Sequence, residues 1–321
     1  MLTYIARRFL WACVLFLAVT IVTYVIFFVV PANPAQLVAG KSATAEDIRR
    51  AEHFLGTDRP LYIQYAKFLD RLVIHQSLGT SFATRQDVNK IVGRAAPVTA
   101  SLVLGGAVLW LLIALPLGIL SALKPRSLLD RMGMVFVLVG ISAHPVWIGL
   151  ILAYTFGYKL GVAPISGYCD MINPDTGCGG PVQWAWHMML PWVTFAMVFA
   201  ATYTRFIRAN VIETMNEDFV RTARAKGAPE SQVMRSHVLR NALLTVVTIL
   251  GLDISLALGG AIFTENVFGL PGLGQVAIES IANFDLPITQ GIVVFATLSI
   301  ITITFFVDLA YAWIDPRVRL S

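Results

Sequence analysis

Long apolar stretches alternate with short polar ones along this chain. Six of the apolar stretches reach the ~20 residues that an α-helix needs to cross the hydrocarbon core of a bilayer. Their approximate bounds are Phe9–Val30, Val98–Leu123, Met132–Phe156, Met188–Ile207, Ala242–Thr264 and Ile288–Trp313. This pattern predicts an all-α polytopic membrane protein with six transmembrane helices.

The first apolar stretch has two interpretations. Arg7 and Arg8 precede it, and Pro31-Ala32-Asn33 after it could form the cleavage region of a signal peptide. Its apolar part is longer than the ~7–15 residues usual for a signal peptide, which favours an uncleaved membrane anchor. We therefore expect residues 1–30 to form an N-terminal segment and the first transmembrane helix.

Residues 31–96 are predicted to form a helical extracytoplasmic insert. Thr44 can cap a helix that ends near Leu55, and Pro60 can begin a second one. Apolar residues recur at helical spacing in the second helix, at Leu61, Tyr65, Phe68, Leu69 and Leu72. The remaining residues, 97–321, are predicted to form the core membrane domain with five spans.

The positions of the cations predict the topology. The chain has 321 residues, is 57% hydrophobic and 13% charged, and has a mean hydropathy of +0.72. Fourteen Lys and Arg lie in the short segments on one side of the six spans, against only Lys159 in those on the other. The fourteen are Arg7, Arg8, Lys124, Arg126, Arg131, Arg205, Arg208, Arg221, Arg224, Lys226, Arg235, Arg240, Arg317 and Arg319. The positive-inside rule therefore places both termini in the cytoplasm. The same rule explains the net charge of +5, because the cations lie at the ends of the membrane spans and do not form a nucleic-acid-binding patch.

The polar loop, residues 213–241, is predicted to form two short helices on the cytoplasmic side. Asn216 can act as the N-cap of the first, ahead of two carboxylates that suit the positive end of the helix dipole. Gly227 suits the left-handed position after that helix, and Pro229 can open the second helix at its first position. A compact helix–glycine–helix unit attached to a membrane domain suits binding by another protein.

Two stretches of the polar loop, DFVRTARAKG and HVLRNALL, resemble the cytoplasmic EAA loop of ABC-importer permeases of the dipeptide/oligopeptide/nickel branch. In that family the short coupling helix sits in a cleft of an ATP-binding subunit and follows its motion. Arg221, Thr222 and Ala223 stand where the family name has Glu-Ala-Ala, and Thr245 replaces a frequent proline. The resemblance implies a type I ABC importer permease fold. It also implies a coupling role for Glu217, Asp218, Phe219, Arg221, Thr222, Ala223, Arg224, Lys226 and Gly227.

Other stretches extend the resemblance over essentially the whole chain. LGTDRPLYIQYAKFLDRL and SLGTSF in the insert, and the terminal Asp-Pro-Arg, are similar to the same branch. FTENVFGLPGLG is similar to the family signature E-x-x-F-x-x-P-G-x-G. The signature implies a re-entrant turn and short helix at the outer gate, with Glu265, Phe268, Pro271, Gly272 and Gly274. No GxxxxGK[ST] phosphate-binding loop occurs, so we expect no nucleotide site in this chain.

Two polar residues fall near the middle of predicted spans. Asp253 in an apolar helix is costly unless it faces the bundle interior or water. It is predicted to line the translocation path, where it could contact a cationic group of the cargo, or else to pair with a neighbouring helix. His144, beside Pro145, could line the same path or could be a residue at a helix kink. With Ser142 they are the only candidates for catalysis, and their spacing supports none.

Cys169 and Cys178 bracket a strong turn sequence, Asn173-Pro174-Asp175-Thr176-Gly177, in a segment expected outside the membrane. The turn can bring the sulfurs together in an oxidising compartment, so a disulfide is predicted, with free thiols as the alternative. This loop could touch a substrate-delivering partner or be a simple connector. No spacing typical of a metal site is present, and we expect no metal.

The resemblance implies one permease subunit of an ATP-driven importer in the bacterial cytoplasmic membrane, with di- or oligopeptides as cargo. Its implied partners are a second homologous permease subunit, two ATP-binding subunits that hold ATP and Mg, an extracytoplasmic substrate-binding protein and membrane lipid. Nickel, glutathione and haem are alternative cargoes within the same architecture. An ion-coupled secondary transporter is the alternative of another class, although it would leave the polar loop without a role.

Overall fold

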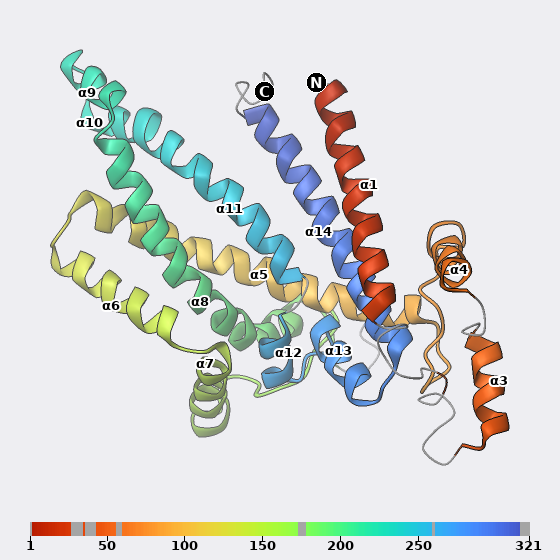
Figure 1. Cartoon of the computed structure of the whole chain (residues 1–321). Helices are drawn as coiled ribbons and strands as arrows, with labels where there is room; N and C mark the ends of the chain where they lie inside the picture. Colours follow the sequence, from red (N-terminus) through yellow and green to blue (C-terminus); the bar gives the residue numbers. More distant parts are fainter. Residues whose placement is uncertain are drawn as a thin grey trace. The chain divides into compact units, whose positions relative to one another are not determined.

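The computed structural model describes residues 2–26, 35, 43–55, 60–172, 178–258 and 261–314 (Figure 1). These residues are mostly helical, and within them the only β-pairing is two isolated bridges. The helices are α1 (Leu2–Tyr24), α3 (Ala45–Leu55), α4 (Leu61–Val73), α5 (Val88–Leu123), α6 (Leu128–Ser142), α7 (Pro145–Leu152), the π-helix η2 (Ala153–Lys159), α8 (Pro181–Met215), α9 (Asp218–Ala225), α10 (Glu230–Gln232), the π-helix η3 (Val233–Leu239), α11 (Arg240–Leu258), α12 (Ile262–Phe268), α13 (Leu273–Ala282) and α14 (Leu286–Ile314). This confirms the all-α fold class.

The predicted spans correspond to long apolar helices in the described ranges. Five helices are long and apolar enough to cross a membrane, and a sixth span results if one bent pair of helices is counted as one. Several of the helices extend beyond the predicted bounds, because the polar residues that flank the apolar stretches are also helical. For example, α5 begins at Val88, ten residues before the predicted start of the second span. Part of the predicted Phe9–Val30 span and of the insert lies outside the described residues.

The third predicted span is broken, which corrects the expectation of one helix over Met132–Phe156. Helices α6 and α7 meet at a bend of 105°. Pro145 has no N–H for the helix ladder and disfavours helical dihedrals at the residue before it. His144 accordingly has extended backbone angles (φ −71°, ψ 139°) and caps α7, its Nδ1 accepting from the Val146 N–H at 3.3 Å.

The chain forms two compact units, with one boundary inside α5, after Val98, and the other between α12 and α13, after Pro271. The first unit comprises residues 1–98 and 272–321. In it α1 and α14 lie side by side (Figure 1). Tyr24 of α1, Phe68 of α4 and Val294 of α14 form a buried cluster. This cluster confirms that α4 is amphipathic.

A buried carboxylate ties distant parts of the first unit together. Asp285, which immediately precedes α14, is 2% exposed. Its side chain accepts hydrogen bonds from the Ser81 hydroxyl, the Phe82 N–H at 3.1 Å and the Ala83 N–H at 3.2 Å. The SLGTSF stretch of the insert is therefore fixed to the start of the last span. The sequence alone did not indicate this contact.

The second unit comprises residues 99–271, in which α6 and α11 pack against α8. Close approach of α5 to α8 depends on two small residues of α5, Gly105 and Gly118. A Cβ on Gly105 would lie 2.2 Å from the Trp192 ring, and one on Gly118 would lie 2.8 Å from the Ile207 side chain. Larger residues at these positions would force helices apart.

An ion pair joins the start of α6 to the second half of α8. The Arg208 Nε donates to Asp130 Oδ1 at 2.8 Å, and its Nη2 donates to Oδ2 at 3.1 Å. Asp130 is only 5% exposed and also accepts from the Arg126 N–H at 2.8 Å. Ser127 caps α6 by accepting from the Asp130 N–H. The Asp130 carboxylate thus accepts three hydrogen bonds, one from Arg126 and two from Arg208.

Candidate functional site

Helix α9 lies at one end of the α8–α11 pair, within the polar loop (Figure 1). Its inward face is apolar: Val220 is fully buried and Ala223 nearly so. The other predicted coupling residues are exposed to solvent. They are Glu217, Asp218, Phe219, Arg221, Thr222, Arg224, Lys226 and Gly227. The helix is therefore attached through one narrow face and leaves the rest of its surface open.

The end of α9 is a Schellman motif. Gly227 adopts φ +79°, its N–H donates to the Arg224 carbonyl at 3.0 Å, and the Ala228 N–H donates to the Ala223 carbonyl at 3.2 Å. This left-handed position is the one predicted for Gly227, because a residue without Cβ adopts it at little cost. A Cβ on Gly227 would meet nothing within 4 Å, so only the backbone conformation restricts the residue.

Arg224 braces the turn that follows. Its guanidinium donates from Nε to Glu230 Oε2 at 3.1 Å and from Nη2 to Oε1 at 2.7 Å. The hydrogen bond to Glu230 raises the pKa of the Arg224 guanidinium above its usual value. This two-point contact bridges the glycine turn and joins α9 to the start of α10.

Two details of the predicted loop are corrected by the structure. Asn216 ends α8 and does not cap α9; the N-cap is Glu217, which makes no capping hydrogen bond through its side chain. Pro229 is the N-cap of α10 and not its first helical residue. The predicted second helix is also not a separate short one, because helix continues without a break from Glu230 to Leu258. The second part of the polar loop is therefore the beginning of the helix that contains the predicted fifth span.

Asp253 borders a cavity of about 340 Å³ within the second unit. Its neighbours there include Pro145, Phe195, Phe199 and Phe263. The carboxylate also accepts a hydrogen bond from the Tyr203 hydroxyl at 2.6 Å, so both interpretations of Asp253 have a counterpart in the structure.

His144 does not border this cavity directly. Its ring makes an edge contact with Phe263, with centroids 4.9 Å apart, and the residue is otherwise exposed. The structure therefore places His144 one side chain away from the cavity that Asp253 borders. Its visible role is to cap α7 at the break in the third span.

The predicted gate residues fall on two short helices. In the second unit Glu265 and Phe268 of α12 are buried, and the Thr99 hydroxyl donates to Glu265 Oε1 at 2.6 Å. The left-handed residue that ends α12 is Gly269 (φ 58°), which the signature does not contain. Pro271 follows, Gly272 is the N-cap of α13, and Gly274 is buried on that helix. The structure thus has the turn and short helix that the signature implies, and it leaves their gating role as a proposal.

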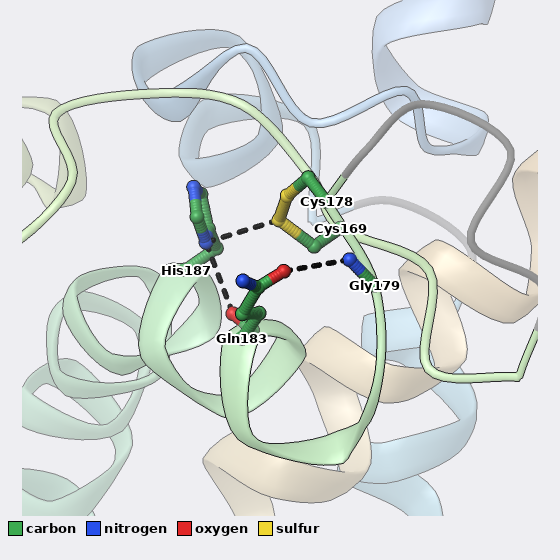
Figure 2. Close-up of a disulfide and its surroundings, with 5 residues drawn as sticks. All are labelled: Cys169, Cys178, Gly179, Gln183 and His187. Atoms are coloured by element: carbon green, nitrogen blue, oxygen red, sulfur yellow. Dashed lines mark hydrogen bonds between the residues drawn. A yellow bond between two sulfur atoms is a disulfide. The ribbon is translucent and has the colours of Figure 1, made fainter.

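In the structure a disulfide joins Cys169 to Cys178, with Cα atoms 5.3 Å apart (Figure 2). His187 of α8 lies against it, with Nδ1 3.2 Å from the Cys169 Sγ and 3.0 Å from the Gln183 carbonyl. The predicted turn, residues 173–177, lies outside the described residues. The same loop contacts the gate segment, because the Gly167 N–H donates to the Phe268 carbonyl at 3.0 Å.

The two cysteines and His187 could also be considered as metal ligands, since their donor atoms lie within 4.8 Å of one another. Thiolates, however, are the form in which cysteine ligates metals. A Cys169–Cys178 disulfide leaves only the imidazole, so the bonded state does not fit a metal site.

We predict that alkylation of the denatured, unreduced protein leaves Cys169 and Cys178 unmodified and modifies Cys13, which forms no disulfide in the structure. Mass spectrometry of the digested protein checks this, with a reduced sample as the control in which all three cysteines take the label. Full labelling of Cys169 and Cys178 without reduction would refute the disulfide.

The long apolar helices define a multi-pass membrane protein. The chain belongs to the family described as "Binding-protein-dependent transport system inner membrane component", which it matches over residues 114–320. Residues 1–103 match the corresponding N-terminal family. The resemblance to importer permeases is thereby confirmed.

Named relatives cover nearly the whole chain. It is 34% identical to the dipeptide transport system permease protein DppB of Alkalihalophilus pseudofirmus, over 99% of this chain and 100% of the relative. It is 35% identical to the probable D,D-dipeptide transport system permease protein DdpB of Escherichia coli, over 98% and 97%. It is 33% identical to the oligopeptide transport system permease protein AppB of Bacillus subtilis, over 99% and 100%. The chain is thus a permease and not an enzyme, and it is a multi-pass inner membrane component of a transport system with other parts.

Proposed function

We propose that this chain forms half of the translocation pathway of an ATP-driven importer for di- and oligopeptides. The proposal is carried by one structural observation made within a permease family: α9 is a short helix with a glycine cap and an open surface, and the turn at residues 226–229 connects it to the continuous helix Glu230–Leu258. The peptide cargo is proposed from the relatives, whose names specify dipeptides and oligopeptides.

In this proposal α9 is a coupling helix. An ATP-binding subunit, which holds ATP and Mg, would bind the exposed residues of α9. When the two ATP-binding subunits close on each other, α9 would move with the subunit that binds it. Because the Arg224–Glu230 contact bridges the glycine turn, the pull would reach α11 and hence Asp253 and the cavity. Such a subunit pair biases a two-state membrane domain through binding energy supplied outside this chain.

The complete importer would contain a second, homologous permease subunit, two ATP-binding subunits and an extracytoplasmic substrate-binding protein. Both termini of this chain and the polar loop would face the cytoplasm, which follows from the cation distribution. The Cys169–Cys178 loop and the gate segment would face the opposite side, where the binding protein delivers its cargo. This chain itself would hold no nucleotide and carry out no covalent chemistry.

Uptake measured in proteoliposomes tests the proposal. The assembled complex with its binding protein should accumulate labelled dipeptide only when ATP is inside with the ATP-binding subunits. A complex lacking those subunits, prepared in parallel, should show no accumulation. Accumulation that persists without them, driven by an ion gradient, would instead establish a secondary transporter. Native mass spectrometry of the loaded binding protein identifies the cargo in the same preparation.

A further inference from the structure

The cavity beside Asp253 combines apolar walls with a single ionisable side chain among its described lining residues. It has a volume of about 340 Å³ and is bordered by Phe195 and Phe199 of α8, Leu256 of α11 and Phe263 of α12. This volume is at the lower end of the range for ligand pockets in proteins, ~300–1,000 Å³. The cavity is therefore suited to one chemical group of a cargo and not to a whole oligopeptide.

The Asp253 carboxylate is only partly satisfied by the protein. Tyr203 donates to Oδ2 at 2.6 Å. In the part of the chain that the structure describes, no cation pairs with Asp253 and no donor reaches Oδ1. Carboxylates in apolar spans are costly, and they mark functional sites when they face a cavity. A positively charged group is the partner that this carboxylate lacks.

Aromatic rings border the cavity next to this carboxylate. The rings of Phe195 and Phe199 have centroids 5.1 Å apart, and Trp110 stacks on Phe199 at 4.6 Å. Trp110 also contacts Tyr203, with centroids 5.7 Å apart, so one buried cluster fixes both the wall and the donor to Asp253. Aromatic faces attract cations, and the attraction increases when water is excluded.

We propose that this cavity binds a cationic nitrogen of the transported peptide, with Asp253 as its counter-ion and Tyr203 as the residue that positions the carboxylate. The inference rests on the proposed function and names a substrate group for it. Two sources have this chemistry: the α-ammonium group at the N-terminus of any unblocked peptide, and the side chain of a lysine or arginine. A purely structural Tyr203–Asp253 pair is the alternative outcome.

Protection of an engineered cysteine tests this without relying on uptake. In the assembled complex, Leu256→Cys combined with Cys13→Ser places a thiol at the cavity, and its rate of reaction with N-ethylmaleimide is measured. A bound ligand slows the reaction by the factor 1 + [ligand]/Kd, about tenfold at ten times the Kd. Glycylglycinamide carries only an α-ammonium, Nα-acetyl-lysinamide only a side-chain ammonium, and Nα-acetylglycinamide no charge.

We expect protection by one or both of the charged compounds and none by the neutral one, and the compound that protects identifies the source of the nitrogen. Adding Asp253→Asn should abolish the protection, because asparagine can still accept from Tyr203 but carries no charge. Leu252→Cys, on the same helix but outside the cavity lining, is the matched control and should react at the same rate with every compound. Equal protection by the neutral compound, protection by neither amine, or protection that survives Asp253→Asn would overturn the proposal. The comparison of compounds in the Leu256→Cys protein decides the matter even if the Asp253→Asn variant does not assemble. The proposed function is tested separately by ATP-dependent uptake in the parent complex, which would persist even if this binding proposal were overturned.

Discussion

Replacing Gly227 with valine is expected to reduce peptide uptake about tenfold while the assembled complex continues to hydrolyse ATP. The residue has φ +79° at the end of α9. A left-handed conformation costs a residue with Cβ roughly 1–2 kcal/mol, and valine, being β-branched, is among the poorest residues there. The Schellman cap would open, and α9 would no longer transmit motion to α11. Uptake and ATP hydrolysis measured in the same proteoliposomes check this.

Gly227→Asn is the matched control for this prediction. Asparagine adopts the left-handed region much more readily than other residues, and a side chain at this position meets nothing within 4 Å. Uptake by this variant should stay near that of the parent protein. Equal uptake by the valine and asparagine variants, at either a high or a low level, would show that the backbone conformation at Gly227 does not govern coupling.

Replacing Asp130 with alanine is expected to destabilise the second unit by about 1.5–3 kcal/mol, the usual contribution of hydrogen bonds to a charged group. Arg208 would keep its charge at a site where its side chain is only 27% exposed, and the Arg126 N–H would lose its acceptor. Thermal unfolding of the purified complex, followed by the loss of monodisperse protein, should show a clearly lower midpoint.

The double variant Asp130→Leu, Arg208→Met separates the contribution of charge to stability from the contribution of packing. Replacing a buried ion pair with apolar residues of similar volume is often neutral or stabilising, so the double variant should regain most of the loss. A midpoint for Asp130→Ala equal to that of the parent protein would show that the pair contributes nothing to stability. A double variant as unstable as the single one would assign the effect to packing or to the Arg126 contact.

The length of the apolar stretches predicted the class of fold, because a bilayer requires helices of a minimum length and hydropathy. The sequence also predicted the cap at Gly227, since positive φ is a local property of the backbone. Helix ends were predicted less well. Asn216 is the better N-cap by side-chain preference, but the N-cap of α9 is the next residue, Glu217. Assignments of helix ends commonly differ by one or two residues.

Contacts between residues far apart in sequence were not predicted. Asp285 accepts from Ser81, which is 204 residues away, and Arg208 pairs with Asp130 over a separation of 78. Tyr203, which donates to Asp253, was not singled out either, although a tyrosine in an apolar helix often has a hydrogen-bond partner. Local patterns cannot identify such partners, because tertiary packing decides which side chains meet.

The central claim is that α9 is moved by an ATP-hydrolysing subunit that binds it, and a site-specific cross-link tests this most directly. A photoreactive amino acid replaces Phe219, which is 42% exposed on α9, and the complete complex is irradiated with and without ATP. The same substitution at Leu138 of α6, which is 65% exposed but far from the polar loop in sequence, is the control. The account predicts that Phe219 cross-links to an ATP-binding subunit and Leu138 does not. An α9 helix that forms no cross-link to any ATP-hydrolysing chain in an active, intact complex would contradict it.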